Sequence, residues 1–134
     1  MDRPYLLSEK SPTILVVDDD ASVRDLVTYL LEMDGYKVLK AKHSQEALLF
    51  EEEFSGPIHL LLTDFCMRPH PNGCELANRV RHHRPGIPVL YMSGYVEDDS
   101  LQQDLESSQA AFLSKPFSPS GLLECVRKML RVHA

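Results

Sequence analysis

The stretch that decides the fold is Thr-Ile-Leu-Val-Val-Asp-Asp-Asp at residues 13–20. It begins as an apolar run rich in β-branched side chains and ends in three consecutive aspartates. A short run that is apolar on both faces is typical of a parallel strand covered by helices on both sides. The carboxyl ends of such strands meet at one edge of the sheet, where ligands bind. The stretch therefore predicts an α/β fold with acidic side chains at its binding edge.

Strand and helix patterns alternate five times along the chain, which predicts βαβ crossovers and a parallel sheet. Residues 1–12 are expected to be a lead-in, and residues 13–134 to be one domain. The expected strands are residues 13–17, 36–41, 58–63, 87–92 and 111–113. Helical periodicity is seen over residues 44–54, 72–84 and 96–107, and around 122–130. The first helix has one apolar face made of Val23, Leu26, Val27, Leu30 and Leu31.

Composition and net charge argue against several classes of function. The 134 residues suit a single domain, and 43% hydrophobic with 25% charged residues is ordinary for a globular protein. A formal net charge of −6 argues against a nucleic-acid or membrane surface. No apolar run reaches membrane-spanning length and the first residues do not resemble a signal peptide, so a cytoplasmic location is expected. The three cysteines, Cys66, Cys74 and Cys125, are too few and too spread for a disulfide framework or zinc site.

Charged residues end three of the expected strands. Asp18 and Asp19 follow the first, Asp64 follows the third, and Lys115 follows the fifth. Carboxylates gathered at one edge repel one another, so they need a cation and an ammonium group nearby. The pattern predicts a site for Mg²⁺ and a phosphoryl group. Asp20 is expected to be a residue of the helix cap region instead.

Four motifs together resemble the receiver domain of two-component response regulators. Ile-Leu-Val-Val-Asp-Asp-Asp, Thr-Asp-Phe-Cys-Met, Tyr-Met-Ser-Gly-Tyr and Ser-Lys-Pro-Phe follow one another at successive strand ends, within residues 13–132. The third motif is most similar to receivers of hybrid histidine kinases. The resemblance implies a (βα)5 flavodoxin-like three-layer sandwich with a five-stranded parallel sheet of order 2-1-3-4-5. It implies a cytoplasmic phosphoacceptor in a phosphorelay, which catalyses only its own phosphorylation and dephosphorylation.

The resemblance also implies roles for the acidic residues. Asp64 matches the phosphoacceptor, whose carboxylate takes the phosphoryl group from a kinase phosphohistidine. Asp18 and Asp19 match the acidic pair that holds Mg²⁺, and the backbone carbonyl of Cys66 adds another oxygen ligand. Ser93 would donate a hydrogen bond to a phosphoryl oxygen. Lys115 would pair with Asp64 and then with the phosphoryl group.

Other positions match residues that shape the switch and the lifetime of the phosphoryl group. Phe112 matches the switch aromatic, which moves inward together with the serine, although a plain core phenylalanine is the competing interpretation. Pro116 matches a proline whose peptide bond is typically cis. Cys66 and Tyr95 match the positions that influence the phosphoryl lifetime, and Tyr95 is expected to shield the aspartyl phosphate from water. The loop after the acceptor is one residue longer than the family pattern.

Partners and alternatives remain partly open. The expected donor is a histidine kinase or a histidine phosphotransfer protein, while the downstream partner and any further domains are left open. A phosphorylation-dependent homodimer could use helix four, strand five and helix five, although Gln102, Gln103, Asp104 and Glu106 make helix four a polar surface. The alternative is a haloacid-dehalogenase-like Mg²⁺ phosphohydrolase with Asp18 as nucleophile. A flavodoxin-like redox module is disfavoured, because no phosphate-binding loop follows the first strand.

Overall fold

A computed structural model describes residues 11–66, 72–94, 98–107 and 109–132 of the chain. Its centre is a parallel sheet of five strands in the order β2-β1-β3-β4-β5. The strands are β1 (Thr13–Val17), β2 (Lys37–Ala41), β3 (Leu60–Asp64), β4 (Val89–Ser93) and β5 (Ala110–Ser114). The predicted fold class and strand order are confirmed.

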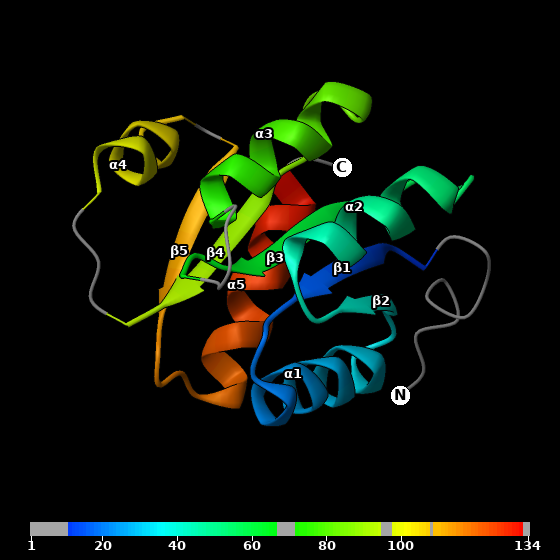
Figure 1. Ribbon diagram of the computed structural model, residues 1–134. Helices are drawn as coiled ribbons and strands as arrows, with labels where there is room; N and C mark the ends of the chain where they lie inside the picture. The colour runs from blue at the N-terminus through cyan, green and yellow to red at the C-terminus, as the bar shows by residue number, and fades with distance from the viewer. Residues whose placement is uncertain (1–10, 67–71, 95–97, 108, 133–134) are drawn as a thin grey trace.

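Five helices cover the two faces of the sheet in the described part of the chain. They are α1 (Ala21–Met33), α2 (Ser44–Glu53), α3 (Gly73–His83), α4 (Asp99–Leu105) and α5 (Pro119–Val132). Helices α1 and α5 lie side by side on one face, and α2 and α3 lie on the other, with α4 beside α3 near β5 (Figure 1). The chain moves one way across the sheet from β1 to β2 and the opposite way from β2 to β5, so right-handed crossovers place helices on both faces and give three layers.

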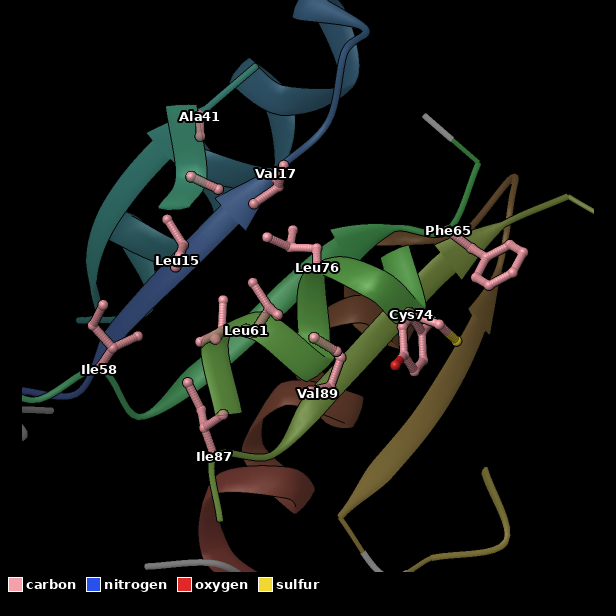
Figure 2. Packing of buried hydrophobic residues seen from close by; sticks show 14 of the residues in the cluster. Leu15, Val17, Ala41, Ile58, Leu61, Phe65, Cys74, Leu76, Ile87 and Val89 are labelled. Carbon is pink, nitrogen blue, oxygen red and sulfur yellow. The ribbon is translucent and has the colours of Figure 1, made fainter. Parts of the chain in front are cut away.

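Each face of the sheet buries its own apolar cluster. Leu15, Leu61 and Val89 project from three neighbouring strands toward Leu76 of α3 (Figure 2). On the opposite face, alternate residues such as Ile14 and Leu62 pack against α1 and α5. Every residue of β1, β3 and β4 is buried, which is the pattern of strands covered on both sides. The central strands are therefore a rigid support for the residues at their carboxyl ends.

The helix and strand ends differ in detail from the prediction. Asp20 is the N-cap of α1 and accepts hydrogen bonds from Ser22 N and Val23 N, so its predicted cap role is confirmed. The fourth strand begins at Val89 and not at residue 87, because Pro88 has no N–H to donate to the ladder. Leu26, on the apolar face predicted for the first helix, is 47% exposed, so only part of that face is buried. The buried stripe of this helix is narrower than the apolar one.

No helix within the described ranges is both long and apolar enough to cross a lipid bilayer.

Candidate functional site

Three strand ends bring the predicted charged residues together. Asp18 follows β1, Asp64 is the last residue of β3, and Lys115 follows β5. Because β1 and β3 are neighbours in the sheet, the two aspartates lie side by side at its carboxyl edge. Lys115 comes from two strands away, and its backbone N–H donates to Ser93 O over 2.7 Å. Its side chain spans the remaining gap.

The acidic residues form one compact group. Asp18, Asp19 and Asp64 each offer a carboxylate oxygen, and these oxygens all lie within 4.8 Å of one another. Asp18 is fully buried and Asp64 is 7% exposed, whereas Asp19 lies at the exposed rim. Oxygen ligands of this kind suit Mg²⁺, which usually keeps several waters and takes one or two carboxylates from a protein. The group therefore has the donor atoms and the open side that such an ion requires.

Lys115 bridges the two buried carboxylates. Its Nζ lies 2.9 Å from Asp18 Oδ2, to which it donates a hydrogen bond, and 3.5 Å from Asp64 Oδ2. The sequence led us to expect a pair with Asp64, and the structure adds the shorter contact with Asp18. Burial tends to lower the pKa of Lys115, but the hydrogen bond and charge of Asp18, together with Asp64, raise it overall. The ammonium group therefore stays protonated.

The environment of Asp64 disfavours its charge. Burial, followed by the negative charge of Asp18, raises the pKa of Asp64 to about 6, and the charge of Lys115 only partly offsets this. The backbone N–H of Cys66 donates to Asp64 Oδ1 over 3.3 Å and holds one oxygen in place. A cation near Asp64 would therefore stabilise the charged form of its carboxylate.

Asp18 is held from two sides. The backbone N–H of Asp20 donates to Asp18 Oδ1 over 2.9 Å. Arg24 Nη1 donates to the backbone carbonyl of Asp18 over 2.8 Å. The sequence prediction did not include Arg24, and the signal available was a basic residue one turn into the helix that follows the acidic run. The turn between β1 and α1 is thus fixed before any ligand binds.

Ser93 and Cys66 contact each other near the proposed acceptor Asp64. Ser93 is the last residue of β4 and is 5% exposed. Its hydroxyl donates to Cys66 Sγ over 3.7 Å. The described contacts of Cys66 use its backbone N–H and its exposed thiol, and none of them concerns the carbonyl that was predicted as a metal ligand. Ser93 therefore ends the strand next to that of Asp64 and is joined to Cys66, two residues beyond Asp64.

The remaining predicted positions fall in three situations. Phe112 is half-buried in β5 and packs against the cluster under α3 and α4. The Lys115-Pro116 peptide bond is cis, as predicted. Tyr95 and residues 67–71 of the lengthened loop lie outside the described residues.

The strand order, with carboxylates and a lysine at the carboxyl edge, defines a doubly wound α/β domain with a ligand-binding site at that edge. Within that class the chain belongs to the response regulator receiver domain family, whose family model matches residues 14–127. It is therefore a phosphoacceptor receiver domain of two-component signalling. The phosphohydrolase alternative is not favoured by these matches.

Curated relatives agree with this assignment. The phosphate regulon transcriptional regulatory protein PhoB of Pseudomonas aeruginosa is 35% identical over 89% of this chain and 52% of its own length. The sensor kinase CckA of Brucella abortus is 34% identical over 90% of this chain but only 13% of its own length. An uncharacterized 14.6 kDa protein of Leptolyngbya boryana is 37% identical over 86% of this chain and 87% of its own. The chain thus spans about half the length of the first relative and 13% of the length of the second.

Solved structures agree as well. The receiver domain of the hybrid histidine kinase CckA is 33% identical with a TM-score of 0.73, over 88% of this chain and 98% of that one. Chemotaxis protein CheY4 of Vibrio cholerae is 27% identical with a TM-score of 0.79, over 90% and 99%. The similarity to a hybrid kinase receiver, predicted from the Tyr-Met-Ser-Gly-Tyr motif, is confirmed.

Proposed function

We propose that Asp64 is the phosphoacceptor of this receiver domain. A carboxylate oxygen of Asp64 attacks the phosphorus of a phosphohistidine, a new oxygen–phosphorus bond forms, and the nitrogen–phosphorus bond breaks as the imidazole leaves. The observation that carries the proposal is the position of Asp64, since its carboxylate lies 3.5 Å from the Lys115 ammonium and within 4.8 Å of the oxygens of Asp18 and Asp19. Phosphoryl transfer depends mainly on such positioning and charge neutralisation.

The acidic group is the proposed Mg²⁺ site. Asp18, Asp19 and Asp64 would hold the ion, with the backbone carbonyl of Cys66 as a further ligand. The rise in the pKa of Asp64, caused first by burial and second by the charge of Asp18, supports a cation here, because a nearby cation would favour the charged form of this carboxyl. When bound, the ion would neutralise charge on the phosphoryl oxygens.

Ser93 and Lys115 are proposed to read the phosphorylated state. Ser93 would donate to one phosphoryl oxygen, and the Lys115 ammonium would pair with the new negative charge. Phe112 would then move inward along the face of the sheet that carries Ser93. Cys66 and Tyr95 are proposed to set how long the phosphoryl group survives.

The partners of the domain are also proposals. A histidine kinase or histidine phosphotransfer protein would supply the phosphoryl group, and a homodimer through α4, β5 and α5 is one output to be tested. The relatives include a transcriptional regulator and a sensor kinase, so similarity alone selects no output. The expected cytoplasmic location, the absence of nucleic-acid binding and the absence of activity on a diffusible substrate stay predictions.

The test is labelling of the purified domain with acetyl phosphate in Mg²⁺. Asp64→Asn should abolish the label, because the amide cannot act as the nucleophile. The matched control is Asp25→Asn, which changes an aspartate on α1 whose side chain is 67% exposed. Labelling that survives in Asp64→Asn and disappears in Asp18→Asn would instead support the phosphohydrolase alternative.

A further inference from the structure

Helix α4 is attached to the domain by few apolar contacts. It spans only seven residues, Asp99–Leu105, and its one buried apolar side chain is Leu101, at 1% exposed. Leu105 is only partly buried against the same cluster. A helix this short has little stability of its own and depends on tertiary contacts. Its position beside α3 must therefore come partly from polar interactions (Figure 1).

Asp104 provides those interactions. Arg81 Nη1, from α3, donates to Asp104 Oδ1 over 3.0 Å and to Oδ2 over 3.1 Å. The hydroxyl of Tyr91, from β4, donates to Asp104 Oδ2 in a short hydrogen bond. The side chains of Arg81 and Asp104 are only 19% and 16% exposed, and Tyr91 is fully buried. One carboxylate thus joins two helices and a central strand.

The hydrogen bonds that Asp104 accepts from Arg81 and Tyr91 are stronger than hydrogen bonds between neutral groups. Burial, and next the hydrogen bond to Asp104, raises the pKa of Tyr91 well above its ordinary value, so its hydroxyl remains a donor. Arginine stays protonated in proteins. Both donors therefore face an acceptor carboxylate, and hydrogen bonds to a charged group are roughly twice as strong as neutral ones.

The same tyrosine adjoins the switch residues. Tyr91 precedes Ser93 by two positions in β4, so the two side chains leave the strand on the same face. Phe112 is the register partner of Tyr91 in β5, and it packs against the cluster that contains Tyr91 and Leu101. Any inward movement of Phe112 toward Ser93 therefore takes place beside Tyr91 and under α4.

We propose that Arg81, Tyr91 and Asp104 form a latch that holds α4 in place while Asp64 is a free carboxylate, and that the phosphorylation switch must loosen this latch. The proposal rests on the proposed function of Asp64, Ser93 and Phe112. Coupling between two sites is reciprocal. If phosphorylation loosens the latch, then a variant with a weakened latch must be phosphorylated to a greater extent.

The first measurement is amide hydrogen exchange of the unphosphorylated domain. Tyr91→Phe removes one hydroxyl, and Asp104→Asn removes the charge of the acceptor. The two variants therefore weaken the latch to different extents. Loss of a hydrogen bond to a charged group should raise exchange of the α4 amides about tenfold. Amides of β1 and α1 should be unaffected. Tyr29→Phe is the matched control, because it removes a hydroxyl from a tyrosine that is 60% exposed on α1.

The second measurement is the extent of phosphorylation at a limiting acetyl phosphate concentration, which a merely structural role would leave unchanged. Tyr91→Phe should raise the ratio of phosphorylated to unphosphorylated protein severalfold over both the wild type and Tyr29→Phe. Unchanged α4 exchange in both variants would overturn the latch. Raised exchange with unchanged phosphorylation would overturn its coupling to the site. A wild-type domain that takes no label would overturn the proposed function itself, which separates the two failures.

Discussion

The ammonium group of Lys115 lies 2.9 Å from the carboxylate of Asp18, across 97 positions of sequence. Asp18 is fully buried, and within the described ranges Lys115 is the cation that donates a hydrogen bond to its carboxylate. A buried charge that loses its partner is strongly destabilising. The lysine therefore stabilises the folded domain through Asp18 in addition to its proposed part in reading the phosphoryl group.

Lys115→Ala should separate these two contributions. Without Mg²⁺, the free energy of unfolding should fall by about 1–3 kcal/mol, because Asp18 and Asp64 are left without the ammonium group. Saturating Mg²⁺ should reduce this loss. Acetyl phosphate should still label the variant, but labelling should no longer change the amide hydrogen exchange of α4. Urea unfolding with and without Mg²⁺ measures the first part. Lys128→Ala, an exposed lysine on α5, is the control, and an equal loss in both variants would contradict the role.

Mg²⁺ should stabilise the folded domain. A ligand that binds only the folded state adds about 2.7 kcal/mol at a concentration one hundred times its Kd. Asp19→Asn should weaken this response, because it removes one of the clustered carboxylates. Asp20→Asn is the matched control, since asparagine is an equally good N-cap and Asp20 lies outside the cluster. The readout is thermal unfolding at constant ionic strength, and an unchanged Tm at millimolar Mg²⁺ would count against the site.

The sequence was sufficient to predict the acidic site because its information is local. Asp18 and Asp64 each follow an apolar run, and parallel strands necessarily bring such ends to one edge. The order of the strands could not be read from periodicity and came only from the family resemblance. Packing of a helix face is likewise non-local, so periodicity placed Leu26 on the apolar face of α1 but could not show that this side chain is 47% exposed.

Polar contacts between distant elements were not predictable. Asp104 was predicted only as one of the polar residues that make helix four a polar surface, whereas its carboxylate accepts hydrogen bonds from Arg81 and Tyr91. Nothing within the helix sequence distinguishes Asp104 from Glu106, which is exposed. Arg24 is a similar case, because its bond to the Asp18 carbonyl depends on the turn between β1 and α1. Such residues become apparent only when the neighbouring elements are in place.

The raised pKa of Asp64 predicts that the free energy of unfolding depends on pH. Its ordinary pKa is 3.8 and the folded value is about 6, so the folded state binds more protons than the unfolded state between these values. Stability from this group therefore falls as the pH rises through that window. In Mg²⁺-free buffer, Asp64→Asn should be more stable than the wild type at pH 8, and the difference should shrink toward pH 4. Urea unfolding across this range measures it, and a difference that grows toward low pH would refute the assignment.

Gly73, the first residue of α3, lies so close to the backbone at the end of β3 that no side chain fits there. A Cβ built at this position would lie 2.9 Å from the Asp64 carbonyl oxygen and 2.9 Å from Phe65 Cα, both of which are backbone atoms. The backbone N–H of Gly73 also donates to Phe65 O over 2.9 Å, so the helix start is tied to the acceptor loop. Gly73→Ala must therefore displace α3 or this loop.

We expect Gly73→Ala to lower the free energy of unfolding by about 1–3 kcal/mol, as for other overpacked sites. Displacement of the loop should also reduce the rate of labelling by acetyl phosphate, because a small misplacement of reacting groups is costly. Gly94→Ala is the stability control, since a Cβ there meets no atom within 4 Å. If both glycine variants unfold at the same urea concentration as the wild type, the close approach of α3 to the acceptor strand does not constrain the domain.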